Sequence, residues 1–169
     1  FSIIEDASHA LGGSYSSIPV GSCQYSDITV FSFHPVKIIT SAEGGMAMTN
    51  NPILARRMYD LRSHGITKSP SHFIETDPPP WHYEQYSLGF NYRLSDIHAA
   101  LGISQLSRLS SIVAERNRLL NVYRSLSFHL PFRFLSIPDD VVSSLHLAVI
   151  VLDSSSSHLH RKVFASMRN

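Results

Sequence analysis

Lys37 is a lone amine within an apolar stretch of the chain. The sequence holds only three lysines, and the other two, Lys68 and Lys162, lie among polar residues. Segment 27–36 reads as a strand that runs straight into Lys37, and two isoleucines follow it. Apolar surroundings disfavour the ammonium form and should lower the pKa of this amine. A neutral amine is what a lysine needs to form a Schiff base. The alternative is a lysine that snorkels out of a strand end into water.

Asp6 ends a second predicted strand, over residues 3–5. In open α/β sheets, ligands bind beyond the carboxyl ends of the strands, so Asp6 and Lys37 both occupy positions typical of site residues. The pair suits pyridoxal phosphate, because a lysine forms the Schiff base with this cofactor while an aspartate keeps its pyridine nitrogen protonated. Taken alone, Asp6 fits a helix N-cap or a turn residue better.

Five blocks of residues occur in order along nearly the whole chain. They are EDASHALG at 5–12, FSFHPVK at 31–37, EGG at 43–45, RSHG at 62–65, and GFNYRL at 89–94 followed by DIHAALG at 96–102. Together these blocks resemble the DegT/DnrJ/EryC1/StrS family, whose members are pyridoxal-phosphate aminotransferases of nucleotide sugars. Residues 9–12 and 32–37 look closest to the branch that aminates a 4-keto sugar on the pseudaminic acid pathway.

The resemblance implies an α/β chain with part of the type I aminotransferase fold. Residues 1–108 would form part of the large cofactor-binding domain, 109–127 a connecting helix, and 128–169 the truncated start of the small C-terminal domain. The family's first strands, and the turn that cradles the cofactor phosphate, would precede Phe1. We therefore expect a truncated or partial gene product.

The resemblance also assigns roles to single residues. Lys37 and Asp6 would be catalytic, and both would hold the cofactor. His9 would lie against the cofactor ring or its phenolic oxygen, and the hydroxyl of Ser32 would bind the phosphate. Ser32 can otherwise be an ordinary strand serine.

Asn91 would bind the cofactor phosphate of the neighbouring subunit, which implies a homodimer with shared active sites. Its alternative is a turn cap before the helix that starts near Ser95. His34 and Arg93 are weaker candidates for contacts with the substrate, and a packed, hydrogen-bonded histidine is an equal alternative for His34.

The implied reaction is a transamination in two half-reactions. An amino acid, usually glutamate in this family, would supply the amino group, and a keto nucleotide sugar would accept it. Lys37 would move the proton as general base and acid. Some relatives carry histidine in place of this lysine and are sugar dehydratases, so Lys37 argues against that class.

A different hypothesis is that the chain is a non-catalytic remnant of such an enzyme. The motif residues favour an enzyme lineage, whereas the lack of a phosphate cradle argues against a competent site. The genomic sequence upstream of Phe1 would discriminate between the two, because an in-frame continuation favours the enzyme.

Composition excludes several other classes. The net charge is +1 with 16% charged residues, and no basic run of the kind that binds nucleic acid is present. A single cysteine, Cys23, excludes an internal disulfide and fits a reducing cytoplasm. No apolar run approaches the ~20 residues of a membrane span. The scattered histidines, including the pair His158 and His160, lack the spacing of a zinc site.

Periodicity predicts alternating strands and helices. We expect strands at 3–5, around 18–20, at 28–33, 46–49 and 147–152, and helices at 52–63, from 95, along 109–126, and from the serine run 154–157 to 168. The apolar stripe of helix 109–126 should be core. Segment 66–87, which contains three consecutive prolines, should be a loop.

Overall fold

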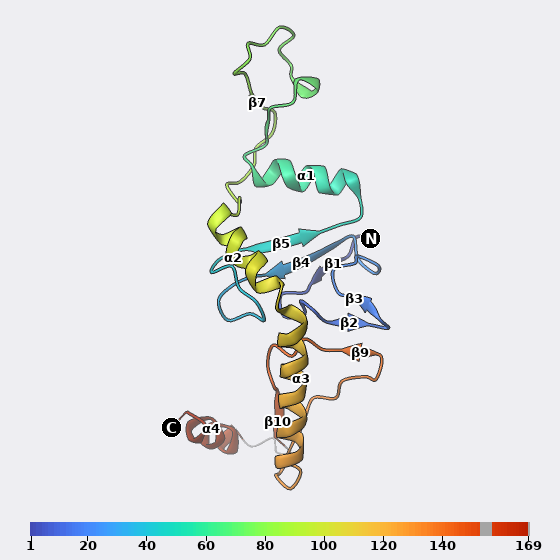
Figure 1. The fold of residues 1–169 in the computed structure, drawn as a ribbon, viewed down its shortest axis with the longest axis vertical. Helices are drawn as coiled ribbons and strands as arrows, with labels where there is room; N and C mark the ends of the chain where they lie inside the picture. Colours follow the sequence, from blue (N-terminus) through green and yellow to red (C-terminus); the bar gives the residue numbers. More distant parts are fainter. Residues whose placement is uncertain (153–156, 169) are drawn as a thin grey trace.

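The computed structural model describes residues 1–152 and 157–168. The elements are strung along one long axis, with a protruding arm at one end, a small sheet in the middle and a long helix running to the other end (Figure 1). The fold is mixed α/β, as expected.

The central sheet has the order β1-β4-β5. Its strands are β1 (Ile4–Asp6), β4 (Ile28–Ser32) and β5 (Gly45–Met48). Strand β1 runs parallel to β4, with Asp6 opposite Val30, and β5 runs antiparallel to β4. The predicted strands are confirmed with shifts of about one residue. However, β4 ends at Ser32, so the expectation that a strand runs straight into Lys37 is wrong: Phe33–Pro35 leave the ladder and Lys37 lies in the turn beyond.

Two helices with clear N-caps flank the sheet. Helix α1 (Pro52–Arg62) starts where the side chain of Asn51 accepts hydrogen bonds from the backbone N–H groups of Ile53 and Leu54. Helix α2 (Asp96–Leu106) starts where Ser95 accepts from the N–H of His98. Both caps satisfy backbone donors that the first helical turn leaves free.

Segment 66–87 forms an arm rather than a plain loop, which corrects the prediction. It contains β6 (Ile66–Thr67), the short 3-10 helix η1 (Pro70–His72) and β7 (Glu84–Gln85), and β6 pairs with β7 in an antiparallel hairpin. The two strands are too short to show the period-2 pattern that identifies a strand in sequence. We call residues 66–87 the arm.

Buried Asp60 fastens the base of the arm to helix α1. Its carboxylate accepts hydrogen bonds from Nε of Arg56 at 2.9 Å and from the hydroxyl of Tyr86. Its backbone oxygen accepts from the N–H of Gly65 at 2.8 Å. These contacts join helix α1 to both ends of the arm.

Helix α3 (Leu109–Leu126) leads into a second group of short strands. Strand β8 (Phe132–Phe134) pairs with β10 (Ile150–Leu152), and β9 (Val141–Val142) joins the hairpin of β2 (Ser14–Tyr15) and β3 (Ile18–Pro19). The predicted strand 147–152 is therefore shorter than expected. Strand β9, in the proposed small domain, pairs with β2 of the proposed large domain. The proposed domain boundaries at 108 and 127 stay a prediction.

The apolar stripe of α3 is core only in part, which corrects the expectation that all of it is buried. Val113 and Leu120 are buried, whereas Tyr123 and Leu126 remain 51% and 69% exposed. The C-terminal half of the helix has too little of the chain packed against it to cover the stripe.

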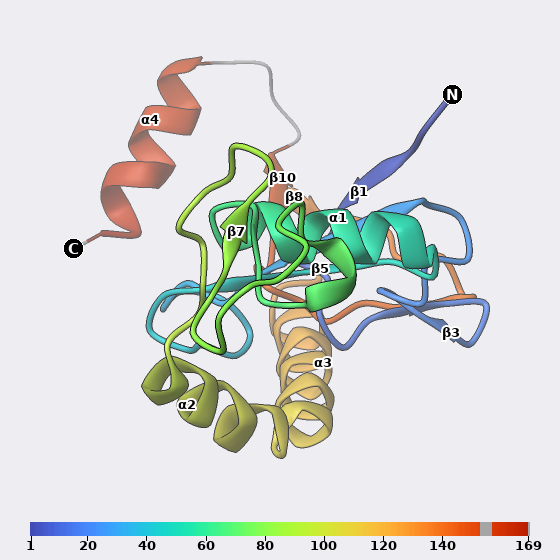
Figure 2. The same ribbon diagram turned by 90° about the horizontal axis from the view of Figure 1, so that it is seen from above.

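Helix α4 (Ser157–Ser166) stands apart from the sheet in both views (Figures 1 and 2). It ends two residues before the predicted end. Residues 154–156 of the serine run, which we expected to cap this helix, lie outside the described residues.

The described part of the chain has a small core and a large exposed apolar surface. The buried apolar residues are Ala7, Phe31, Ile38, Ile39, Val113 and Leu120. Many large apolar side chains are exposed, as in the arm and on helix α2. Among the helices that the structure describes, none combines the length and the apolar character that crossing a membrane requires.

Replacing Gly65 by alanine should loosen the base of the arm. Gly65 has φ +67°, and a Cβ there would lie 2.1 Å from the carbonyl oxygen of Ser87. The left-handed conformation alone costs an alanine roughly 1–2 kcal/mol, and the clash adds to it. Gly65→Ala should therefore lower the free energy of unfolding, measured by urea denaturation, by at least this amount.

The matched control is Gly102→Ala in helix α2. A Cβ at Gly102 would meet Ser41 Cβ at an ordinary 3.5 Å, and alanine in a helix interior is favoured over glycine by about 0.5–1 kcal/mol. A Gly65 variant as stable as the wild type would contradict the close packing of the arm against its own base.

Candidate active site

Asp6 lies at the carboxyl end of β1, where the chain turns away from the sheet. Its Oδ1 accepts two hydrogen bonds from Ser8, one from the hydroxyl at 2.6 Å and one from the backbone N–H at 3.0 Å. The N–H of Ala7 donates to the carbonyl of Val30 on β4 at 2.9 Å. This turn orients the exposed carboxylate. Asp6 is therefore a turn residue, and this role is compatible with the proposed role in a site.

The hydrogen bonds from Ser8, its hydroxyl first, hold the pKa of the Asp6 carboxyl below its ordinary value, and the positive charges of His9 and Lys37 act in the same direction. Each of these groups stabilises the charged carboxylate. Asp6 therefore remains an anion at neutral pH.

Lys37 lies in the turn that follows β4. The turn is held by hydrogen bonds from the N–H of Lys37 to the carbonyl of His34 at 3.0 Å and from the N–H of Ser41 to that of Phe33 at 3.0 Å. Lys37 is half-buried, and the next two residues, Ile38 and Ile39, are buried in the core. The buried isoleucines anchor the turn and so place the amine.

Asp6 and Lys37 are brought into each other's electrostatic field, because the positive charge of Lys37 acts on the Asp6 carboxylate. The parallel pairing of β1 with β4 produces this arrangement, since the carboxyl ends of both strands lie at one edge of the sheet. The side chain of His9, in the turn after β1, belongs to the same group.

His146 completes the group, and no sequence motif singles it out. Its ring centroid lies 4.3 Å from that of His9, and its buried Nδ1 has no hydrogen-bond partner among the described residues. Burial lowers the pKa of His146, and the positive charges of His9, Lys37 and Arg116 lower it further. The neutral imidazole is therefore favoured.

Arg116 of helix α3 positions this histidine. Its Nη1 donates to the backbone oxygens of Leu145 and His146 at 2.9 and 3.3 Å. The hydroxyl of Ser144 donates to the backbone oxygen of His9 at 3.0 Å. These hydrogen bonds connect the turn that carries His9 to the turn that carries His146. The two histidines are 137 positions apart in sequence, so the sequence analysis did not identify His146.

Ser32 and His34 lie between the strand and Lys37. The Ser32 hydroxyl accepts a weak bond from the N–H of His34 at 3.4 Å, and Nδ1 of His34 accepts from the N–H of Val36 at 3.3 Å. Both side chains support the turn from its strand end.

Asn91 and Arg93 lie in the segment that follows the arm. Asn91 is exposed and pairs with Ser63 in an isolated β-bridge. Arg93 lines a small cavity of about 210 Å³ beside Glu43 and Gly44. Neither has a described contact with Asp6 or Lys37 in this single chain. Within the described residues, no three His, Cys, Asp or Glu side chains gather as metal ligands would.

Removing the Ser8 hydroxyl should raise the pKa of Asp6. That hydroxyl is the largest cause of the lowered value, so Ser8→Ala should move the pKa towards 3.8, the ordinary value. Because the folded-state pKa is depressed, the stabilisation that Asp6 contributes is present above the ordinary pKa and is lost as pH falls through the folded-state value. NMR titration of the Asp6 carboxyl carbon measures the shift.

Ser2→Ala, a change at an exposed serine near the N-terminus, is the control and should leave the titration unchanged. An unaltered Asp6 midpoint in Ser8→Ala would show that the hydroxyl does not bond the carboxylate in solution.

Comparisons with known proteins agree on one family. The model of the DegT/DnrJ/EryC1/StrS aminotransferase family matches residues 1–169. The chain is 41% identical over 151 residues to the UDP-4-amino-4,6-dideoxy-N-acetyl-beta-L-altrosamine transaminase of Campylobacter jejuni, a match that covers 89% of this chain and 37% of the relative. It thus spans little more than a third of that relative's length.

Solved structures show the same relationship. Helicobacter pylori PseC, an aminotransferase in the biosynthesis of pseudoaminic acid, superposes with a TM-score of 0.84 at 34% identity, covering 99% of this chain and 43% of PseC. A Streptococcus pneumoniae protein described as a sugar aminotransferase, in its PLP form, gives a TM-score of 0.85 at 30% identity over 99% of this chain and 41% of its own. The architecture is therefore part of the type I aminotransferase fold, and the chain belongs to the DegT/DnrJ/EryC1/StrS aminotransferase family.

Proposed function

We propose that this chain provides the catalytic lysine and aspartate of a pyridoxal-phosphate-dependent aminotransferase that acts on a keto nucleotide sugar. The observation that carries the proposal is the convergence of Asp6 and Lys37 at the carboxyl edge of β1 and β4. It agrees with the family of the chain, one of whose solved members was captured in both a PLP and a PMP form.

The residues present fit this cofactor. The Ser8 hydrogen bonds keep Asp6 ionised and occupy Oδ1, which leaves Oδ2 to pair with a protonated pyridine nitrogen. Lys37 supplies the amine for the cofactor aldehyde. The His9 ring, which lies against His146, would pack beside the cofactor, and the Ser32 hydroxyl would donate to its phosphate.

When bound, pyridoxal phosphate supplies a conjugated ring that accepts the electron pair of a broken C–H bond. Asp6 holds the ring-nitrogen proton that this electron flow requires. As a free amine, the Lys37 Nζ would take the proton from the substrate carbon and deliver it to the cofactor carbon. The neutral His146 ring adds no positive charge to this group of side chains.

The substrates follow from the relatives. We propose an amino acid, in the first instance glutamate, as amino donor and a 4-keto UDP-sugar as acceptor. The 41% identity to the altrosamine transaminase and the structural match to PseC support this branch of the family. The single cysteine fits a cytoplasmic enzyme. In keeping with the fold family, we assign residues 1–108 to the large domain and 128–169 to the small one.

The attachment of pyridoxal phosphate tests the proposal directly. The chain is incubated with the cofactor, treated with borohydride, digested and analysed by mass spectrometry. We expect the reduced cofactor on Lys37, because this residue is half-buried and follows β4 at the sheet edge where β1 ends in Asp6. Lys37→Ala should lose this modification, and Lys162→Ala, at an exposed lysine of α4, should keep it. Modification of all three lysines to the same extent, or of none, would support the non-catalytic alternative.

We also propose a homodimer in which Asn91 binds the cofactor phosphate of the neighbouring subunit. Asn91 is exposed and has no described contact with Asp6 or Lys37 of its own chain, which supports a role across an interface. A two-fold dimer would then contain two shared sites.

Complementation measures this arrangement in the complete protein that contains this chain. Asn91→Ala and Lys37→Ala variants should each have little activity. In a mixed dimer one site carries both changes and the other carries neither, so mixing should restore activity, with about one quarter of wild-type turnover expected for random exchange of equal amounts. If subunits exchange and no activity returns, Asn91 acts within its own chain or not at all.

A further inference from the structure

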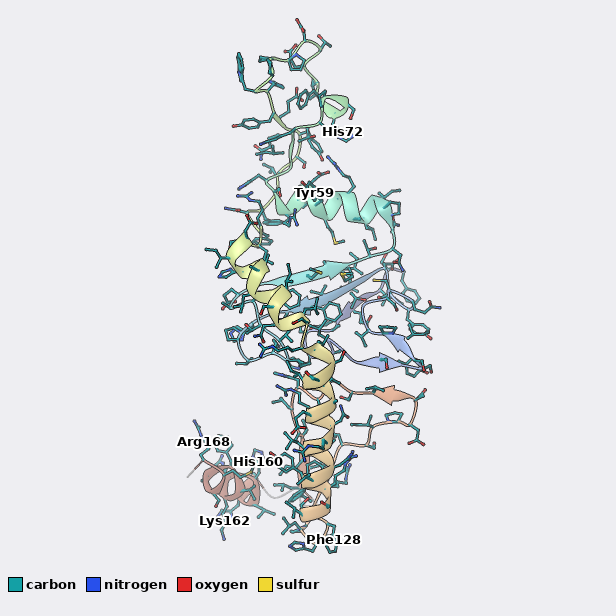
Figure 3. All side chains as sticks on the ribbon, in the orientation of Figure 1. Tyr59, His72, Phe128, His160, Lys162 and Arg168 are labelled. Atoms are coloured by element: carbon teal, nitrogen blue, oxygen red, sulfur yellow. The ribbon has the colours of Figure 1, made fainter. Side chains whose placement is uncertain are left out.

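Helix α3 runs from the central sheet to the far end of the molecule, with side chains along its length (Figure 3). Two polar side chains near its middle hold residues 143–146. Arg116 Nη1 donates to the backbone oxygens of Leu145 and His146, at 2.9 and 3.3 Å. Asn117 Nδ2 donates to the first backbone oxygen of the segment at 2.9 Å. Three of the four backbone oxygens of the 143–146 segment are therefore bonded to the helix.

The backbone of the 143–146 segment is held in an uncommon conformation. Leu145 has φ +51°, in the left-handed region, which has a steric cost for a residue with a bulky side chain. The N–H of Leu145 donates to the hydroxyl of Ser143 at 3.2 Å, while its carbonyl accepts from Arg116. Non-glycine residues held at positive φ gather at functional sites. The strained residue directly precedes His146, so the segment is constrained where the position of this ring is set.

The same segment contacts the turn that carries His9. The hydroxyl of Ser144 donates to the backbone oxygen of His9 at 3.0 Å, and Ser144 is only 2% exposed. The rings of His9 and His146 lie with their centroids 4.3 Å apart and their planes at 38°. The 143–146 segment therefore fixes both the backbone of His9 and one side of its ring.

His146 is suited to packing more than to hydrogen bonding. Its Nδ1 is buried and has no hydrogen-bond partner among the described residues. Burial is the largest cause that lowers the pKa of this imidazole, and the positive charges of His9, Lys37 and Arg116 lower it further. The neutral ring can lie against His9 without repelling it, whereas an imidazolium would face these three positive charges.

We propose that His146 is a positioning residue that holds the His9 imidazole for the cofactor, and that Arg116 acts through it from helix α3. The inference rests on the proposed function, in which the His9 ring packs beside pyridoxal phosphate. It extends that function to residues of the connecting helix and of the proposed small domain. The position of the 143–146 segment thereby determines how the His9 ring lies.

NMR spectroscopy of the histidine rings, in the chain without cofactor, tests the placement. The wild type should show a nuclear Overhauser contact between the rings of His9 and His146. Arg116→Met removes both hydrogen bonds and keeps an unbranched side chain. It should weaken this contact and raise the pKa of His146, because a positive charge and part of the burial are lost. Arg118→Met should change neither, because Arg118, on the same helix, is exposed and pairs with Glu115.

Two variants of His146 separate packing from nitrogen chemistry. His146→Ala removes the ring, and the pyridoxal phosphate concentration that gives half-maximal borohydride-trapped modification of Lys37 should rise about two- to tenfold, as expected for loss of an aromatic pair. His146→Phe keeps a flat ring without a nitrogen and should return this concentration towards the wild-type value. If the phenylalanine variant behaves like the alanine variant, the packing role is overturned.

The ring contact should also depend on pH in a way that a purely structural contact does not. Because the pKa of His146 is lowered in the folded chain, the contact should be complete above the ordinary value of 6.5 and be lost as pH falls through the folded-state value. In His146→Phe the contact with His9 should persist over the same range. A wild-type contact that survives protonation of His146 would contradict the requirement for a neutral ring.

The amide resonances of β1 and β4 report whether each variant is folded. If His146→Ala fails to fold, Ser144→Ala replaces it, since this change removes only the hydroxyl that donates to the His9 carbonyl. It should likewise weaken the attachment of the cofactor to Lys37. An unchanged ring contact in Arg116→Met would overturn the inference.

The two readouts distinguish this inference from the proposed function. If the cofactor fails to attach to Lys37 in the wild type while the ring contact still depends on Arg116, the proposed function fails and the placement of His9 stands. If the cofactor attaches to Lys37 equally well in the wild type and in His146→Ala, the positioning role fails and the proposed function stands.

Discussion

The parallel pairing of β1 with β4 is the constraint on which the candidate site depends. It places the ends of two strands, which are separated by more than twenty residues of sequence, at one edge of the sheet. The turn after β1 carries Asp6 and His9, and the turn after β4 carries Ser32 and Lys37. Because β5 pairs antiparallel on the other side of β4, it adds its starting end to the same edge through Gly45, opposite Ser32.

Hydrogen bonds, burial and nearby charges then set the charge states of the polar side chains at this edge of the sheet. Ser8 orients the Asp6 carboxylate and keeps it ionised, whereas burial and three nearby positive charges keep His146 neutral. Both pKa values are lowered, and the two shifts favour different charge states: Asp6 is an anion and His146 a neutral imidazole. Helix α3 contributes through Arg116, which holds the backbone that carries His146.

The chain has a large exposed apolar surface and a small buried core. Within residues 1–152 and 157–168, six apolar residues are buried, while helix α2 has no buried residue and β5 is exposed along its length. Relatives that share this architecture are more than twice as long. The arm is joined to α1 by the hydrogen bond from Tyr86 to Asp60, and the segment around Asn91 is joined to it by backbone hydrogen bonds from Phe90 to Leu61 and from Tyr92 to Arg62.

The sequence by itself determined the family, the α/β class and most helix positions, because caps such as Asn51 and Ser95 and the spacing of apolar residues act over a few positions. It also singled out Asp6 and Lys37, since polar residues after apolar strands are visible as a pattern. Only the tertiary structure decided that Lys37 lies in a turn beyond β4, that 66–87 folds into an arm, and that His146 lies against His9. These features come from contacts between segments distant in the chain, and neither local propensity nor periodicity encodes which distant segments will meet.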